Sequence, residues 1–163
     1  MRSGGRKTTR LGPMRDLTHG EGQDLLERYK RAWQGNDPDA AMALYAPGAE
    51  HRDHPFRDPY QDENAIRGMW NDIAANEDHV EFDAERIWVA ARTVLASWHA
   101  AYTDRTSGER VRLRGFATFE LDEAGLIQRL REWPVSRVVG MDSTFRSEPV
   151  APVSREADPT HGR

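Results

Sequence analysis

The first half of the chain carries apolar residues at helical spacing. The pattern predicts one helix that Gly35 ends and whose apolar face comprises Leu25, Leu26, Tyr29, Ala32 and Trp33. Asp37 can cap a second helix, Pro38 fits its first turn, and Pro47-Gly48 stops it. A third helix is predicted over residues 63–76, because its apolar residues recur at i, i+3, i+4 and i+7: Ile66, Met69, Trp70 and Ile73.

From residue 80 the apolar period changes to two, which is typical of strands. Strands are predicted over residues 80–89, 93–103, 111–121 and 126–135, with a phase slip in the first that indicates a bulge. Short hairpin turns join them at Thr106-Ser107-Gly108 and at Asp122–Gly125. Residues 49–54 form a short extended piece, and 55–62 a loop. This order predicts an α+β fold in which three N-terminal helices cover a curved, mostly antiparallel sheet and enclose a cone-shaped cavity.

Composition limits the class of protein. A length of 163 residues predicts one domain, over residues 18–142. Residues 1–17 are expected to be a disordered basic arm and 143–163 a disordered, proline-containing tail. The chain has no cysteine, which excludes disulfides and thiolate chemistry and favours a cytoplasmic location. It has no apolar run of about 18 residues, so no membrane partner is predicted.

The charge is unevenly distributed. The net charge is −4, although the first 18 residues are basic, so the body of the chain is acidic. Nucleic-acid binding needs a concentrated basic face for phosphate contacts, and no nucleic-acid partner is therefore predicted. A small hydrophobic molecule in the cavity is the expected partner.

Three stretches of the sequence carry a resemblance to a known superfamily. They are Tyr29-Lys-Arg-Ala-Trp33 with Asp37 and Ala40-Ala-Met-Ala-Leu-Tyr-Ala46; His54-Pro55-Phe56 leading to Asn64-Ala65-Ile66-Arg67; and Phe119-Glu-Leu-Asp-Glu-Ala-Gly125-Leu-Ile127 leading to Arg131-Glu132-Trp133. From about residue 25 to 135 the chain resembles the nuclear transport factor 2-like superfamily. That group includes ketosteroid isomerase, SnoaL-like polyketide cyclases, limonene epoxide hydrolase and scytalone dehydratase. The fold hosts enzymes and non-enzymes alike.

The resemblance implies candidate catalytic residues in the first half. Tyr29 stands where ketosteroid isomerase has its oxyanion-binding tyrosine, and a buried phenol can donate to a developing enolate. Asp53, 24 residues further on, matches the spacing to that enzyme's carboxylate base, and His54 competes for the same place. Ala117 occupies the position of the isomerase's second oxyanion donor, which argues against steroid isomerisation. Alternatively, Tyr29 is an ordinary core residue and Asp53 an exposed turn residue.

Glu132 is the candidate base on the last strand, where epoxide hydrolases and SnoaL-like cyclases have a working aspartate. Strand alternation places it on one face with Gln128 and Leu130, while Ile127, Arg129, Arg131 and Trp133 share the other. The hydrolases also need an arginine and an aspartate where this chain has Trp98 and Ala100, so that triad is broken. A structural salt bridge is the alternative role for Glu132. The expected substrate pocket comprises Trp33, Trp70, Trp98 and Leu130.

His51-Arg52-Asp53-His54 is the one segment with the composition of a metal site. In a strand His51 and Asp53 share a face that His54 does not, so three ligands cannot converge from this segment. No metal and no cofactor are predicted. His99 is expected on the outer sheet face, which commonly forms the dimer contact in the superfamily, so the resemblance implies a homodimer.

Two functions remain open at this stage. The first is a cofactor-independent isomerase, cyclase, dehydratase or hydrolase that uses general acid–base chemistry on a small hydrophobic substrate. Glu132 or Asp53 would be its base, Tyr29 its hydrogen-bond donor and His54 an auxiliary group. The second is a non-catalytic ligand-binding or dimeric interaction domain.

Overall fold

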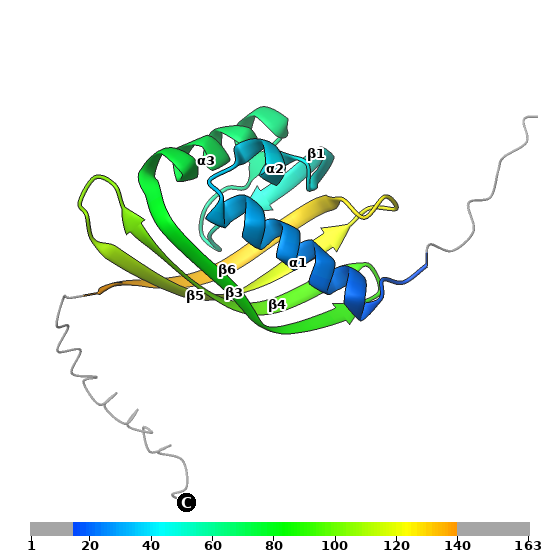
Figure 1. The fold of residues 1–163 in the computed structure, drawn as a ribbon. Coiled ribbons are helices and arrows are strands. Elements are labelled where there is room, and N and C mark those ends of the chain that lie inside the picture. Colours follow the sequence, from blue (N-terminus) through cyan, green and yellow to red (C-terminus); the bar gives the residue numbers. More distant parts are fainter. Residues whose placement is uncertain (1–14, 140–163) are drawn as a thin grey trace, which may run out of the picture.

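The computed structural model describes residues 15–139 (Figure 1). The helices are α1 (His19–Gln34), α2 (Pro38–Met42) and α3 (Glu63–Asn76). The strands are β1 (Tyr45–Arg52), β2 (Tyr60–Gln61), β3 (Glu77–Ala90), β4 (Thr93–Asp104), β5 (Arg110–Leu121) and β6 (Ile127–Val139). They form one six-stranded sheet in the order β2-β1-β6-β5-β4-β3, in which only β1 and β6 run parallel. The predicted α+β class, with three helices on a curved and mostly antiparallel sheet, is confirmed.

Helix α1 has strong local start and stop signals. Thr18 accepts a hydrogen bond from the backbone N–H of Glu21, and the Glu21 carboxylate accepts one from the N–H of Thr18, which completes a capping box. Gly35 ends the helix. The buried face is the predicted apolar stripe, with Leu25 and Tyr29 among its most buried members. This stripe places the Tyr29 and Trp33 side chains in the core between the helix and the sheet.

The second helix is shorter than predicted. It ends at Met42, and the chain enters strand β1 at Tyr45, so Pro47-Gly48 lies inside a strand instead of ending a helix. The reason is a tertiary contact: Leu44 C=O accepts a hydrogen bond from Ile127 N–H, and Tyr45 pairs with Ile127 on β6. Gly48 has a φ of +71°, which glycine adopts without strain, and the pairing register shifts there.

The long strands follow the predicted alternation, with local exceptions. The phase slip in β3 is a bulge between Ala84 and Arg86 in the pairing with β4. A second bulge lies at Gln128, because Glu120 pairs with Arg129 but Leu121 pairs with Ile127. It reverses the predicted faces at the start of β6, so Ile127 is buried and Gln128 exposed. The short strand β2 also lies within the predicted loop 55–62.

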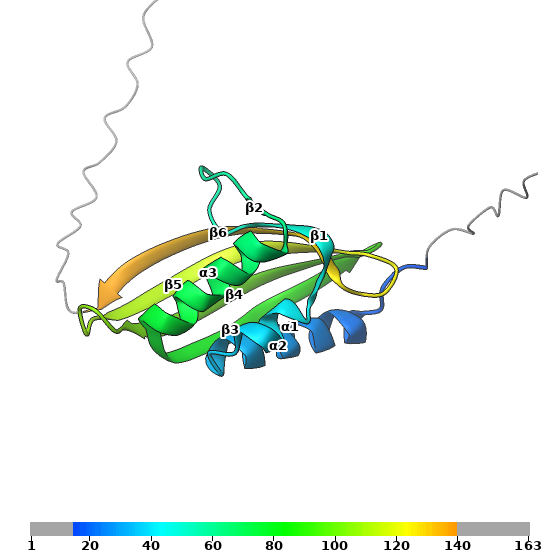
Figure 2. The same ribbon diagram turned by 90° about the horizontal axis from the view of Figure 1, so that it is seen from above.

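The helices lie on one side of the curved sheet (Figure 1). Helix α1 packs against β3, and α3 contacts β1 and β2 near the other edge, as the view from above shows (Figure 2). One core of aromatic and aliphatic side chains joins the two layers, with Phe119 and Leu130 at its centre. Among residues 15–139 no helix is long and apolar enough to cross a membrane.

Residues 15–17 contact the folded domain. Leu17 N–H donates to Ala91 C=O over 2.9 Å, and Arg15 donates to the Glu21 carboxylate. We therefore propose that the domain begins at Arg15. The rest of the predicted arm and the predicted tail lie outside the described residues.

Gly115 on β5 gives the first stability prediction. A Cβ at this position would lie 2.6 Å from Cζ2 of Trp98 and 3.2 Å from Trp133 C=O. We expect Gly115→Ala to displace the Trp98 indole and to lower the free energy of unfolding by about 1–3 kcal/mol, measured by urea denaturation. Gly68→Ala is the matched control: nothing lies within 4 Å of a Cβ on this exposed residue of α3, so alanine should stabilise the helix by roughly 0.5–1 kcal/mol. Equal effects of the two substitutions would contradict the close packing of Trp98 on Gly115.

Candidate functional site

A cavity of about 450 Å³ lies between the concave face of the sheet and helices α1 and α3. This volume is within the range of small-molecule sites. Aromatic and aliphatic side chains make up its walls: Tyr29, Trp33, Tyr60, Met69, Trp70, Ile73, Trp98, Tyr102, Leu113 and Pro134. Its polar and ionisable lining residues are His51, Asp53, His54, Arg57, Asp72, Asn76, Glu77, Glu132 and Ser136. The arrangement fits a molecule with an apolar body and a few polar groups.

Glu132 lies at the centre of a hydrogen-bonded network in this cavity. Its side chain, on β6, is only 12% exposed. Tyr29 O–H on α1 donates to Oε1 over 3.3 Å, and His51 Nε2 on β1 lies 3.5 Å from Oε2. Three elements that are far apart in the sequence therefore hold one carboxylate. A carboxylate fixed in this way inside a cavity is suited to accept a proton from a bound molecule.

His51 is the most buried member of the network, with 2% of its surface exposed. Its Nδ1 lies 2.9 Å from the hydroxyl of Tyr45, and the two rings stack. If the tyrosine donates to Nδ1, the proton of the neutral imidazole is on Nε2 and points to Glu132. In this arrangement Glu132 accepts two hydrogen bonds, from Tyr29 and His51.

Burial and the Glu132 carboxylate raise the pKa of Tyr29 well above its usual value. Burial also raises the pKa of Tyr45. Both phenols therefore stay neutral donors at any working pH. The hydroxyl of Tyr29 donates to Glu132 in this structure, whereas the resemblance implied that it donates to a substrate oxyanion.

Glu77 is a second carboxylate in the same cavity, and sequence reasoning did not single it out. It is the first residue of β3, and its Oε2 accepts a hydrogen bond from Trp33 Nε1 over 2.8 Å. Burial raises the pKa of Glu77 to about 7, and the nearby Asp104 carboxylate adds to the shift. Glu77 is thus a cavity-lining group that changes charge near neutral pH.

Asp53 and His54 both line the cavity, directly after β1 ends. Asp53 Oδ2 accepts a hydrogen bond from Tyr60 O–H over 3.4 Å and lies 3.7 Å from Arg57 Nη1. His54 Nδ1 accepts one from Phe56 N–H. Two of these partners, Arg57 and Phe56, are largely exposed, whereas the Asp53 side chain is 27% exposed.

The structure brings three of the four predicted wall residues together around the cavity. Trp33, Trp70 and Trp98 line the cavity, but Leu130 is fully buried in the core and is not among the lining residues. Ala100 and Ala117, at the positions of the relatives' polar groups, are buried without adding any polar atom. His99 lies on the outer face, 3.4 Å from a Glu85 oxygen. Within residues 15–139 no three histidine or carboxylate side chains gather as metal ligands.

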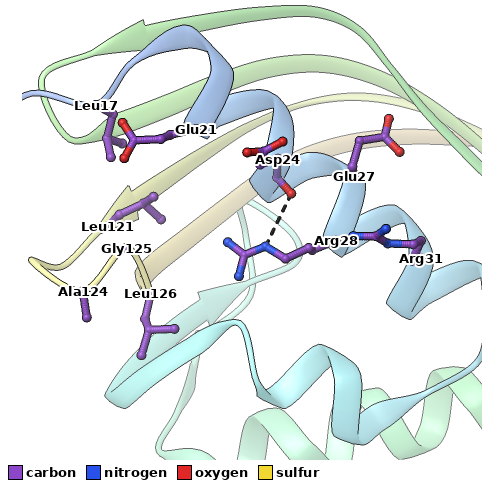
Figure 3. Close-up of a pocket in the computed structure, with 10 residues that line it drawn as sticks. All are labelled: Leu17, Glu21, Asp24, Glu27, Arg28, Arg31, Leu121, Ala124, Gly125 and Leu126. Atoms are coloured by element: carbon purple, nitrogen blue, oxygen red, sulfur yellow. Dashed lines mark hydrogen bonds between the residues drawn. The ribbon is translucent and has the colours of Figure 1, made fainter.

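A larger hollow, of about 580 Å³, lies on the outside of the molecule (Figure 3). It is an open groove between α1 and the turn from β5 to β6, with apolar residues Leu17, Leu121 and Leu126 on one side. Its charged residues come from α1, and Arg28 donates to Asp24 C=O within the helix. Most of these charged side chains are exposed, and none of them forms a salt bridge with another charged residue of the groove among the described residues. We therefore regard the inner cavity as the functional site.

Three helices on one side of a curved sheet, with an acid-lined cavity between the two layers, form a ketosteroid isomerase-like fold. The SnoaL-like domain family matches residues 26–130, and the chain belongs to this family. No curated protein matches the chain.

Solved structures show the same fold at low sequence identity. SalBIII, an epoxide hydrolase/cyclase-like enzyme of pyran ring formation in the polyether salinomycin, superposes with a TM-score of 0.66 at 18% identity, over 73% of this chain and 96% of that one. A protein from Catenulispora acidiphila with a ketosteroid isomerase-like fold, in complex with trimethylamine, has a TM-score of 0.61 at 14% identity, over 68% of this chain and 84% of that one. A putative isomerase from Bacillus subtilis superposes with a TM-score of 0.63 at 18% sequence identity, over 71% of this chain and 87% of that one.

Proposed function

We propose that this protein is a cofactor-independent enzyme that performs general acid–base chemistry on a small molecule held in the inner cavity. Glu132 is its base. Tyr29 and His51 orient the Glu132 carboxylate, and Asp53 and His54 contact the substrate at the mouth. The reaction class is isomerisation, cyclisation, elimination or epoxide opening, each of which needs a positioned proton acceptor.

The observation that carries this proposal is the position of Glu132. A carboxylate that is 12% exposed, bonded to Tyr29 and next to His51, lies in the inner cavity instead of pairing with an arginine. A salt-bridge role would place an arginine beside it, as Arg129 and Arg131 stand beside Glu120 on the outer face. Among the described residues, the only salt-bridge partner of Glu132 is His51. Groups held in this way are typical of functional sites.

The structural relatives support the same class of chemistry. SalBIII is described as epoxide hydrolase/cyclase-like, and the Catenulispora protein was solved with a small amine bound. The resemblance places Trp98 and Ala100 where the epoxide hydrolases have an arginine and an aspartate, and of these two only Trp98 lines the cavity. A SalBIII-like epoxide opening would therefore have to rely on Glu132 and His51.

The experiment that tests the proposal begins with the ligand. Native mass spectrometry of the purified protein identifies a co-purified small molecule, and that compound class, together with a panel of epoxides, is then assayed for turnover. Turnover that disappears on loss of Glu132 supports the enzyme. A bound ligand that is released unchanged, with no turnover of any compound in the panel, would favour the alternative of a non-catalytic binding domain.

We further propose that two copies pair through the outer sheet face. Trp88 and Trp133 there are 46% and 42% exposed, and both pack against Phe116. An apolar face with large aromatic residues at its surface is a liability unless a partner covers it.

We therefore expect light scattering to give twice the 18.6 kDa mass of the chain. Trp133→Glu should shift the mass to that of a monomer, because a buried unpaired charge opposes the contact. Phe56→Glu, at a residue that is 92% exposed and outside this face, serves as the control and should leave the mass unchanged. A monomeric wild-type protein at micromolar concentration would refute the dimer.

A further inference from the structure

The walls of the inner cavity are unusually aromatic. Six large aromatic rings line it: Tyr29, Trp33, Tyr60, Trp70, Trp98 and Tyr102. Several neighbours meet nearly at right angles, with 74° between Trp33 and Trp98 and 73° between Tyr29 and Trp70. Rings set at right angles present both faces and edges to the space that they enclose. The faces of such rings carry negative electrostatic potential and attract cations.

The ionisable lining residues add to this negative potential. Four of them are carboxylic acids, Asp53, Asp72, Glu77 and Glu132, whereas the one arginine, Arg57, is largely exposed and lies beside Asp53. Within the described residues no lysine or arginine lies within salt-bridge distance of Glu77 or Glu132. The cavity therefore holds two half-buried acids without a lysine or arginine of residues 15–139 at salt-bridge distance to balance their charge.

We propose that the natural ligand of this cavity carries a cationic amine, a tertiary or quaternary ammonium group, that sits against the indole rings beside Glu77. This inference rests on the proposed function, because it names the substrate class of the same site. The ammonium group supplies the missing positive charge, and its alkyl groups contact the rings. The rest of the ligand reaches the Glu132 network.

The same features exclude anionic ligands. A carboxylate, phosphate or sulfate in this cavity would meet Glu77 and Glu132, and the lining groups that can carry a positive charge are only His51, His54 and the exposed Arg57. The indole N–H groups of Trp70 and Trp98, which have no partner among the described residues, are neutral donors and do not balance this charge. Burying an anion beside like charges is strongly unfavourable. A neutral ligand could fill the space but would leave the charge of ionised Glu77 uncompensated.

The test compares choline with its uncharged isostere, 3,3-dimethylbutan-1-ol, by isothermal titration calorimetry at pH 7.5 or so. The two molecules have the same shape, so the charge alone separates them. We expect choline to bind at least about tenfold more tightly, because a desolvated cation–π contact and an acid are both available to it. Equal affinity, tighter binding of the isostere, or no choline binding up to about 10 mM would each overturn the proposal.

The Glu77→Gln variant tests whether Glu77 is the acid that makes choline bind more tightly than its isostere. Glutamine keeps an acceptor for Trp33 Nε1 and removes the charge, so choline affinity should fall about tenfold and isostere affinity should not change. Asp78→Asn is the control: this neighbouring acid pairs with Arg105 and does not line the cavity, so choline affinity should stay at the wild-type value. An unchanged choline affinity in Glu77→Gln would exclude Glu77 as the acid that holds the amine.

Proton release gives a further readout. The groups around Glu77 are the phenols Tyr29 and Tyr102, the ionised Asp104, and Arg105, whose guanidinium donates to Glu77 C=O and pairs with Asp78. Choline favours ionised Glu77, so binding near pH 7 should release a proton, and affinity should rise between pH 6 and 8.

Calorimetry in two buffers with different heats of ionisation measures the released proton. His51 and His54 face the same cavity, so the proton is assigned to Glu77 only if its release is lost in Glu77→Gln. Release that persists in this variant would contradict the proposed contact. Because these readouts do not involve turnover, a failure here leaves the role of Glu132 as base intact, and a catalytically silent Glu132 leaves the amine site intact.

Discussion

Glu132→Gln is expected to reduce turnover by roughly 10²–10⁴, the usual size of a lost general acid–base. The glutamine side chain has the same shape and can still accept from Tyr29 O–H, but it cannot take a proton from a substrate. We therefore expect the far-ultraviolet circular dichroism spectrum of the variant to match that of the wild type. The measurement is kcat on the compound that mass spectrometry and the panel identify.

The matched control for this prediction is Glu120→Gln. Glu120 lies on the neighbouring strand β5, on the outer face, where it bonds Arg129 and Arg131. A partly exposed ion pair of this kind contributes little, so turnover should stay within about twofold of the wild type. If Glu132→Gln retained full turnover while the compound was still converted, Glu132 would be a structural residue and another group would be the base.

Most of the fold could be predicted from local pattern. Helix α3 was predicted over its observed span because Ile66, Met69, Trp70 and Ile73 mark one helical face, and Asp62 caps it. The end of α2 could not be predicted, since the pairing of Tyr45 with Ile127 joins positions more than 80 residues apart. The bulge at Gln128 is equally non-local, because only the partner strand reveals the extra residue.

The part of the candidate site that could be predicted is the part that depends on the alternation of side chains within one strand. Alternation along β6 grouped Glu132 with Leu130, and alternation along β4 grouped Trp98 with its flanking alanines. The resemblance to the superfamily then implied that these faces are the inner ones. His51 was considered only as a metal ligand, and its contact with Glu132 depends on the parallel pairing of β1 with β6, which no short motif signals. Glu77 follows a helix in the sequence, and only the approach of Trp33 shows that it is buried.

Glu77→Gln is expected to stabilise the ligand-free protein at alkaline pH and to leave it nearly unchanged at acidic pH. In the unfolded chain Glu77 has its ordinary pKa of 4.5, and in the folded protein burial raises it to about 7. The glutamine of the variant is neutral at every pH, and it still accepts from Trp33 Nε1. The variant therefore imitates the protonated form of Glu77.

Proton binding to Glu77 determines whether the free energy of unfolding rises or falls with pH. Between pH 5 and 7 or so the folded wild type holds a proton on Glu77 that the unfolded chain has released, so the wild-type free energy of unfolding falls by about 1.4 kcal/mol per pH unit. The contribution of protonated Glu77 to stability is fully present below its pKa in the unfolded chain and is lost as the pH rises through its pKa in the folded protein. At pH 8 the total loss is about 3 kcal/mol, which the glutamine variant does not suffer.

Urea denaturation and thermal melting of both proteins from pH 5 to pH 8 measure this difference. The curves should coincide near pH 5 and diverge above it, with the variant melting roughly 5–10 °C higher at pH 8. Glu81→Gln, on the same strand but exposed and paired with Arg110, is the control and should track the wild type within about 0.5 kcal/mol. If Glu77→Gln were no more stable than the wild type at pH 8, Glu77 would be ionised at little cost in the folded protein. It would then have water or a positive charge beside it, and the cavity would lack the uncompensated acid on which the binding of a cationic amine depends.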